Sequence, residues 1–363
     1  MWGKERIWQW YNDRPWIRGC NYMSADCANR IDQWQSYGFE GRLKTTEEEL
    51  KLMQKTGFNS IRIFLSFTVW DQEHNTFYDR FDRYLDLCAQ YGISCMVALA
   101  SDCTRPKALF HEELGPQTYD WGYHGGRKVS QHGTQSEMGY HVLDDPLIAP
   151  CYFEMVRETV ERYKNDPRII IWNVYNEVGA NKRDGVTLPN LQRMFEIIRA
   201  IDPIQPLTCE TWSLGRRELE ALPDVERYAL EHSDIISYHS YKDFVTNIKL
   251  IKTLKQYGRP IMNTEWLARG YQNNVQQMFP LFYLENIGCY NWGFVAGKYQ
   301  TYEPWNKLWD QYYQSPETMN FDFTKWFHDL YRPNHMPYDP KEIELIRYIC
   351  DLADKDFEMR SVK

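Results

Sequence analysis

Two glutamic acids, Glu177 and Glu265, are the strongest candidates for chemistry in this sequence. Glu177 follows the apolar segment RIIIWNVY (168–175), and Glu265 ends the segment PIMNTE (260–265). Cleavage of a glycosidic bond uses two carboxyl groups, one protonated to release the leaving oxygen and one ionised to attack the anomeric carbon. The pair therefore predicts glycoside hydrolysis, provided that the fold brings the two carboxyls together.

Neighbouring groups are expected to separate the acidities of these two carboxyls. Arg62 and Tyr241 would favour an ionised Glu265 through charge and hydrogen bonding. Glu177, facing that charge in a partly desolvated pocket, is expected to have a raised pKa and to carry a proton. When Glu265 forms a glycosyl ester its charge disappears, so the pKa of Glu177 should fall. Glu265 is thus the predicted nucleophile and Glu177 the predicted acid/base.

Eight short apolar segments alternate with amphipathic segments along the chain. Continuous apolar strands are typical of a parallel sheet covered on both faces, and the alternation is typical of βα units. Eight units predict an α/β fold, a (β/α)8 barrel formed by one domain over residues 1–363, although a doubly wound sheet has the same local pattern. The predicted strands are residues 17–22, 59–65, 93–100, 168–175, 206–210, 234–239, 260–265 and 288–293.

Helical segments and two long insertions separate these strands. Thr46 to Glu49 have the capping-box pattern, which predicts the start of a helix that ends near Gly57. The insertions, residues 101–147 and 295–338, both follow predicted strands, and such βα loops lie on the catalytic face of a barrel. The other predicted helices cover residues 79–90, 148–163, 189–200, 244–256, 273–286 and 340–354.

Polar and aromatic residues gather where the predicted strands end. Burial of so many polar groups would be costly without a function for them, so their register predicts a shared site. The candidates for substrate contact are Asn21, Tyr22, Arg62, Asp102, Asn176, Trp212, His239, Tyr241 and Trp292, together with Lys298 at the entrance. Lys298 has an alternative reading as part of a solvated loop, and Glu210 is a competing carboxylate with a sugar-contact or structural role.

Four of these strand ends carry a specific resemblance. IWNVYNE (171–177), SYHSY (237–241), NTEW (263–266) and YNWG (290–293), with Arg62, resemble the clan of retaining glycosidases that includes the family 5 cellulases and mannanases. The order of these motifs is similar over roughly residues 17–300. Segments 19–35, 290–305 and 326–340 look like a bacterial group of cellulase-like or xylanase-like glycosyl hydrolases.

The resemblance implies roles for individual residues. It implies that Asn176 bonds the sugar 2-hydroxyl, that Arg62 and Tyr241 orient Glu265, that His239 contacts the sugar or Glu177, and that Trp292 stacks beneath the sugar. Family 5 enzymes often have a histidine on the third strand, whereas this chain has Ser101-Asp102-Cys103 there. That departure bears on the substrate more than on the chemistry. The resemblance implies no cofactor and no catalytic metal.

The composition of the chain argues against some classes of binding partner. The 363 residues carry a net charge of −8, which argues against nucleic acid. No apolar run is long enough to span a bilayer, and the start of the chain lacks the pattern of a signal peptide. The nine cysteines include no CxxC pair, so we expect buried free thiols and a cytoplasmic location. The expected partner is a small carbohydrate, and the oligomeric state is left open.

Three alternatives stay open at this point. A transglycosidase would use the same site with a sugar acceptor, and a non-catalytic barrel would bind sugar without turnover. A metal-dependent hydrolase would use the histidines of the 101–147 insertion, whose spacing matches no ligand motif. These histidines are His111, His124, His132 and His141. The long loops also suggest exo action, with one end of the cleft closed.

Overall fold

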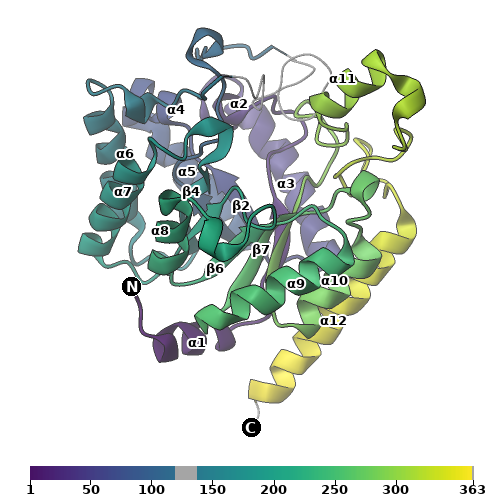
Figure 1. Cartoon of the computed structure of the whole chain (residues 1–363). Helices are drawn as coiled ribbons and strands as arrows, with labels where there is room; N and C mark the ends of the chain where they lie inside the picture. The colour runs from purple at the N-terminus through teal and green to yellow at the C-terminus, as the bar shows by residue number, and fades with distance from the viewer. Residues whose placement is uncertain (119–136, 362–363) are drawn as a thin grey trace.

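Eight parallel strands form the centre of the molecule. The computed structural model describes residues 1–118 and 137–361 (Figure 1). Every predicted strand is present, each within a few residues of its expected bounds. The strands are β1 (Arg18–Asn21), β2 (Ser60–Phe64), β3 (Ser94–Ala98), β4 (Ile169–Val178), β5 (Leu207–Thr211), β6 (Ile236–His239), β7 (Ile261–Trp266) and β8 (Gly288–Trp292).

The sheet closes on itself into a barrel. Each strand pairs with its sequence neighbour except β5 with β6, and β1 also pairs with β8, which gives the order β5-β4-β3-β2-β1-β8-β7-β6. Between β5 and β6 the Asp234 amide donates to the Leu207 carbonyl at 2.8 Å, and the hydroxyls of Thr208 and Ser237 lie 2.5 Å apart. The predicted (β/α)8 barrel is therefore confirmed, and a doubly wound sheet is excluded.

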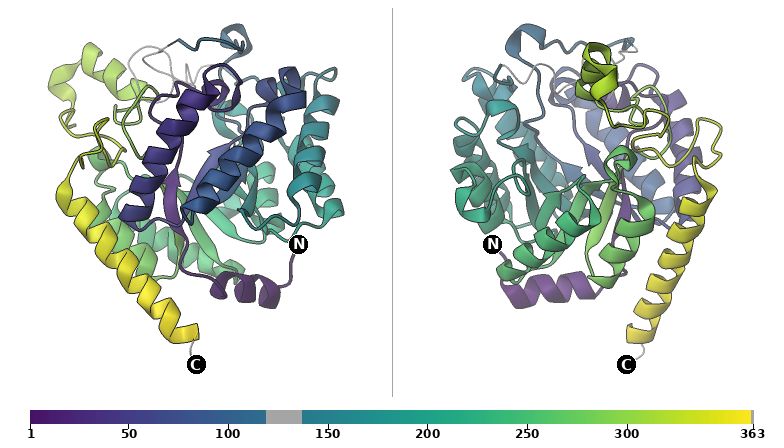
Figure 2. Two further views of the ribbon diagram at one scale, coloured as in Figure 1. Left: turned by 180° about the vertical axis from the view of Figure 1, so that it is seen from behind. Right: turned by 45° about the vertical axis from the view of Figure 1, so that its right-hand side comes forward.

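Helices surround the barrel on its outer side (Figures 1 and 2). Their amphipathic faces bury apolar side chains against the strands, which is why a 3.6-residue period predicted most of them. The α-helices are α1 (Lys4–Asn12), α2 (Arg30–Trp34), α3 (Phe39–Thr56), α4 (Phe67–Gln72), α5 (His74–Gln90), α6 (Ala149–Tyr163), α7 (Leu188–Ile201), α8 (Asp224–His232), α9 (Phe244–Leu254), α10 (Val275–Leu284), α11 (Asn306–Gln314) and α12 (Pro340–Ser361).

The start of α3 corrects one sequence prediction. The helix begins at Phe39, and the Thr46–Glu49 pattern lies in its interior. Glu49 is fully buried and accepts hydrogen bonds from the Tyr22 hydroxyl at 2.7 Å and the Ala25 amide at 3.0 Å. The glutamate therefore ties the helix to the loop after β1 and has no capping role. The predicted end is correct, because Gly57 takes the left-handed conformation at the C-terminus.

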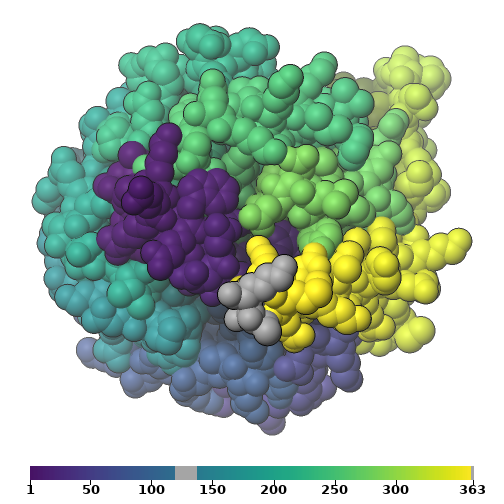
Figure 3. Space-filling model, turned by 90° about the horizontal axis from the view of Figure 1, so that it is seen from below, coloured from purple at the N-terminus to yellow at the C-terminus, as the bar shows by residue number. Residues whose placement is uncertain are grey.

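The lower end of the barrel is sealed by the N-terminal segment. Helix α1 crosses below the strands, and in the view from below this segment, in purple, covers the part of that face left of its centre (Figures 1 and 3). Its side chains Trp2, Ile7 and Tyr11 pack with barrel residues such as Met96 and Met262 in one apolar cluster. The opposite end, where the strands terminate, remains available for a site.

None of the helices that the structure describes has the length and apolar character needed to cross a membrane.

The close approach of β1 to β2 depends on a glycine. A side-chain carbon at Gly19 would lie 1.7 Å from the Ser60 carbonyl oxygen of its partner strand. We expect Gly19→Ala to lower the free energy of unfolding by about 2 kcal/mol or more, because backbone must move to relieve the overlap. Denaturant unfolding followed by circular dichroism measures this.

Gly41→Ala is the matched control. Gly41 is exposed within α3, and an added carbon there meets nothing within 4 Å. The expected change is a gain of about 0.5–1 kcal/mol from helix propensity. Equal stability of the Gly19 variant and the wild type would contradict the claimed strand contact.

Candidate active site

One buried guanidinium organises the upper end of the barrel. Arg62 on β2 is fully buried. Its nitrogens donate to Asn21 Oδ1 at 2.7 Å, Asn176 Oδ1 at 2.6 Å and Glu265 Oε1 at 3.1 Å. It also donates to Asn173 Oδ1 and lies 3.2 Å from Glu210 Oε2. The cation thus connects side chains of β1, β4, β5 and β7.

Glu265 near the end of β7 is held at both carboxylate oxygens. Arg62 donates to Oε1, and the Tyr241 hydroxyl donates to Oε2 at 2.8 Å. The imidazole Nδ1 of His239 lies 3.4 Å from the same Oε2. A carboxylate fixed in this way presents a defined lone pair to the barrel mouth, as a nucleophile must.

Glu177 projects from β4 with an unusual backbone. Its φ of 49° lies in the left-handed region, which costs a non-glycine residue about 1–3 kcal/mol. The pairing of β4 with β5 also shifts register between Tyr175 and Val178. Such an irregularity re-aims a side chain. The carboxylate accepts from the Cys103 thiol at 2.7 Å, and His239 Nδ1 lies 2.6 Å from its other oxygen.

The two glutamic acids face each other at short range. An oxygen of Glu177, an oxygen of Glu265 and a ring nitrogen of His239 all lie within 4.8 Å of one another. Retaining glycosidases have carboxyls about 5–5.5 Å apart, and inverting enzymes about 6.5–9.5 Å, to leave room for water. The arrangement fits direct attack on an anomeric carbon placed between the carboxyls.

The charges in this cluster are not balanced by Arg62 alone. Burial raises the pKa of Glu265 to about 7, although His239 lowers it and Glu177 raises it further. Burial lowers the pKa of His239, but the charges of Glu265 and Glu177 outweigh this and raise it above its ordinary value. Arg62 and Tyr241 both lower the pKa of Glu265, as expected, but desolvation is the larger effect.

A further carboxylate, that of Glu210, balances the positive charge of Arg62. Glu210 on β5 is fully buried. Its oxygens accept from Asn173 at 2.7 Å, Ser237 at 3.0 Å and Thr264 at 3.1 Å, besides the contact with Arg62. Glu210 is thus a structural counter-ion with no free face toward the mouth, and the competing reading of it as a sugar contact does not fit.

Asp102 also differs from its predicted role. It is fully buried, and its oxygens accept from the Arg183 guanidinium and the Thr187 hydroxyl, both at 2.7 Å, and from the Gly179 amide at 2.8 Å. These bonds fix the backbone that follows Glu177. The expectation that Asp102 contacts substrate is corrected, because every bond it makes is to the protein itself.

The remaining candidates occupy three kinds of position. Asn21 and Asn176 lie in the Arg62 network, and the Asn176 amide also donates to the Ser101 hydroxyl at 3.0 Å. Trp292 lines a pocket beside Asn21, whereas Tyr22 directs its hydroxyl away to Glu49. Trp212 is half-buried after β5 beneath Arg216, and Lys298 is exposed in the loop after β8.

Sequence reasoning missed the two groups that support the carboxylates. Cys103 donates to Glu177, and Asn173 bridges Arg62 to Glu210. The departure from a histidine on the third strand was the signal that could have identified Cys103. Asn173 lies inside an otherwise apolar strand, and a buried amide there demands partners.

The histidine-rich insertion provides no metal centre in the part that the structure describes. His111 is exposed near Glu113, and buried His141 accepts from the Leu143 amide at 3.0 Å. Burial lowers the pKa of His141 to about 3. His124 and His132 lie outside the described residues.

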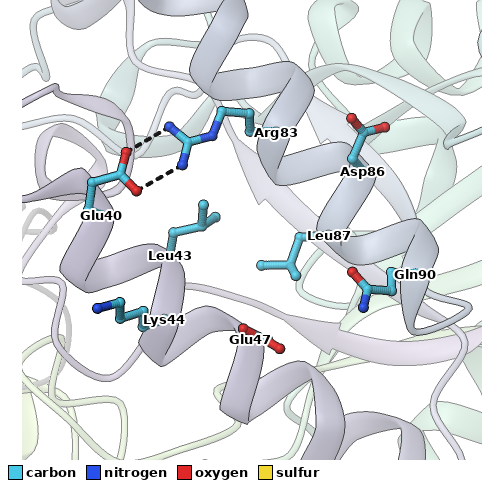
Figure 4. Close-up of a pocket in the computed structure, with 8 residues that line it drawn as sticks. All are labelled: Glu40, Leu43, Lys44, Glu47, Arg83, Asp86, Leu87 and Gln90. Atoms are coloured by element: carbon cyan, nitrogen blue, oxygen red, sulfur yellow. Dashed lines mark hydrogen bonds and ion pairs between the residues drawn. The ribbon is translucent and has the colours of Figure 1, made fainter.

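A separate groove lies on the outer wall of the barrel, between α3 and α5 (Figure 4). Arg83 spans it and forms a bidentate ion pair with Glu40 at 2.7 and 2.8 Å. No strand end contributes to its lining, so it has no part in the chemistry of the mouth.

Comparison with protein families gives one extensive match. The family model described as Cellulase (glycosyl hydrolase family 5) matches residues 23–297. Among curated relatives, a β-galactosidase of Leuconostoc mesenteroides is 24% identical over 167 residues, 46% of this chain and 11% of its own length. A β-galactosidase of Heyndrickxia coagulans is 28% identical over 137 residues, 37% of this chain and 19% of its own length. The chain thus spans a small part of these longer proteins.

Solved structures share the fold at low identity. The β-1,4-mannanase of the sea hare Aplysia kurodai has a TM-score of 0.56 and 16% identity, covering 77% of this chain and 88% of that one. The exo-β-1,4-mannosidase of an Opitutaceae bacterium also has a TM-score of 0.56 and 16% identity, with 94% and 60% covered. At this identity the likeness extends to the barrel architecture alone.

The hydrogen bond from Tyr241 to Glu265 predicts a pH effect. A nucleophile must be ionised, so kcat/KM on an aryl β-glycoside should fall as the pH drops below about 7, the pKa of Glu265. The tyrosine lowers that pKa. Tyr241→Phe should therefore move the acidic limb to higher pH and lower kcat/KM at the optimum about 10-fold.

Tyr271→Phe, which removes a hydroxyl outside this cluster, should leave the profile unchanged. An identical acidic limb in Tyr241→Phe would refute the assignment.

The thiol of Cys103 predicts a change at the opposite limb. A donor to a carboxylate favours its charged form, so Cys103→Ala should move the basic limb of kcat/KM to higher pH. Cys103→Ser keeps a donor and should restore the wild-type limb. If Cys103→Ala and Cys103→Ser gave the same profile, the thiol would be packing only.

Proposed function

The chain belongs to glycosyl hydrolase family 5, and from this membership we propose that it hydrolyses β-linked glycosides with net retention of anomeric configuration. Glu265 is the proposed nucleophile and Glu177 the proposed acid/base. The observation that carries the proposal is the short range between the two carboxyls, with oxygens within 4.8 Å. An inverting reaction would need about 6.5–9.5 Å between them.

The first step forms a glycosyl ester. A Glu265 oxygen attacks the anomeric carbon while the bond from that carbon to the leaving oxygen breaks. Glu177 transfers its proton to the leaving oxygen, so no alkoxide is released. Arg62 and Tyr241 hold Glu265 in line for this attack. Loss of the Glu265 charge then leaves Arg62 with Glu210 as its remaining carboxylate partner.

The second step returns the enzyme to its starting state. Glu177, now ionised, removes a proton from water, whose oxygen attacks the anomeric carbon and displaces Glu265. His239 touches both carboxylates through one nitrogen, at 2.6 and 3.4 Å. We assign it the role of sharing the mobile proton with Glu177 and limiting repulsion when both carboxylates are charged. Tyr241 and Cys103 stay protonated, because burial raises the pKa of both groups.

The proposed substrate is a small glycoside or oligosaccharide. Phe64, Trp292 and Tyr299 line a pocket together with Asn21, which bonds Arg62, and such rings suit the C–H faces of a sugar. A reducing compartment is proposed on the basis of the nine cysteines, all free and eight of them buried. These features support uptake of small substrates over attack on an insoluble polymer.

Glu265→Gln and Glu177→Gln test the assignment. Screening of aryl β-glycosides identifies a working substrate for the wild type. On that substrate Glu265→Gln should lose about 10³–10⁵-fold in kcat, because the first step has no nucleophile. Glu177→Gln should lose about 10²–10⁴-fold, and less with a leaving group that needs no proton. Glu47→Gln, a surface change, should retain wild-type rates.

Proton NMR of the first product decides the stereochemistry. A β-configured sugar should appear first and mutarotate later. Initial release of the α anomer would overturn retention, and unchanged turnover by Glu265→Gln would overturn the nucleophile assignment. Transfer to an added sugar acceptor in preference to water would identify a transglycosidase with the same site.

A further inference from the structure

A cation with no carboxylate partner among the described residues lies against the ring of Phe64, at the end of β2. Arg30, the first residue of α2, is half-buried, and its guanidinium carbon lies 4.3 Å from the ring centroid of Phe64. Within the part of the chain that the structure describes, no carboxylate lies within 4.0 Å of Arg30. Arg183 and Arg269, by contrast, are buried and paired with Asp102 and Glu342.

Arg30 lines a pocket at the end of the barrel where the strands terminate. Asn21, Phe64, Trp292 and Tyr299 line the same pocket. Its cavity volume is about 30 Å³, which is room for a small substituent rather than for a whole sugar ring. Asn21 bonds Arg62, which bonds Glu265, so the pocket lies two hydrogen bonds from the proposed nucleophile.

The barrel geometry indicates which part of a substrate enters the pocket. Glu177 ends β4, and β4 lies across the barrel from β8, which carries Trp292. The leaving oxygen must lie within hydrogen-bond reach of Glu177. The sugar that donates the anomeric carbon, the glycone, therefore extends away from Glu177, over Trp292 and toward Arg30.

Other charged groups of the pocket leave Arg30 unneutralised. Among the lining residues the carboxyl is Asp329, whose two oxygens both lie 2.8 Å from the Thr301 hydroxyl. Burial raises the pKa of Asp329 to about 7, so it carries only part of a charge at neutral pH and forms no ion pair with Arg30. A guanidinium presents a planar fork of donors that matches a carboxylate, sulfate or phosphate.

We propose that Arg30 recognises an anionic substituent on the glycone, so that the substrate is an acidic glycoside such as a uronide. This inference rests on the function proposed above and names its substrate class. The negative group lies at the exocyclic carbon of the ring, where a uronic acid carries its carboxylate. Phe64 and Trp292 contact the apolar ring faces, and Arg30 contacts the charge.

The test compares matched glycosides on three proteins. The substrates are an aryl β-glycoside, its uronic acid, its 6-sulfate and its 6-phosphate, and the proteins are wild type, Arg30→Gln and Arg83→Gln. Wild type should prefer at least one acidic member by 10-fold or more in kcat/KM. Arg30→Gln should lower kcat/KM for that member by about 10–100-fold and change the neutral member less than 3-fold. Arg83→Gln, in the outer groove, should match wild type.

Two further readouts separate the possible failures. Higher ionic strength should raise KM for the acidic member only, because a partly exposed charge pair is screened by salt. Titration of Glu265→Gln should detect the acidic sugar, with inorganic phosphate and sulfate binding more weakly than the sugar that bears the same group. Equal binding of the bare ion would overturn substrate recognition by Arg30.

Preference for the neutral glycoside, or an equal loss on both substrates in Arg30→Gln, would also overturn it. In either case turnover of the neutral glycoside that depends on Glu265 keeps the proposed hydrolase function intact. Absence of Glu265-dependent turnover on every member would instead remove the function itself.

Discussion

The buried guanidinium of Arg62 is the constraint on which the site depends. A charge in the middle of a barrel is costly unless it is paired and hydrogen-bonded. Arg62 meets that demand with partners on four other strands, namely Asn21, Asn173, Asn176, Glu210 and Glu265. Removal of any one partner would leave a buried polar atom without its hydrogen bond, which lowers the stability of the fold. The same bonds that stabilise the cation therefore fix the position of Glu265, the proposed nucleophile.

The excess of carboxylates over cations gives this site its chemistry. Glu210 balances Arg62 below the mouth, so Glu177, Glu265 and His239 must share protons among themselves. His239 Nδ1 contacts both carboxylates. Burial raises the pKa of Glu265. Burial lowers the pKa of His239, but the charges of Glu265 and Glu177 raise it above its ordinary value. A three-group cluster of this kind gives and takes a proton near neutral pH, which double displacement requires.

Strain at the site is compensated by rigid bonds around it. Glu177 adopts a left-handed backbone, and the residues after it are anchored because the Gly179 amide donates to buried Asp102. Asp102 is in turn paired with Arg183, which also bonds Asp144 beneath the loop after β3. This second ion pair lies outside the carboxyl cluster and holds Glu177, the proposed acid/base, in its unusual orientation.

The sequence by itself determined the barrel and its strand ends. Continuous apolar strands alternating with amphipathic helices leave few arrangements, and Glu177 and Glu265 both follow such strands. Five short helices, α1, α2, α4, α8 and α11, were not predicted, because five to nine residues give too few turns for a 3.6-residue period to stand out. The Thr46–Glu49 pattern was misread as a cap because Glu49 bonds Tyr22, a partner distant in sequence.

Only the tertiary structure decided what each polar residue does. Asp102, Tyr22 and Glu210 have the same chemical types as the catalytic groups, yet their bonds to Arg183, Glu49 and Arg62 commit them to structure. Cys103 and His239 both contact Glu177, and the spacing of these residues in the sequence does not predict those contacts. The acidity of Glu265 was decided by burial, a property of the folded barrel. Residue type fixes which bonds a side chain can make, and packing fixes which of those bonds it does make.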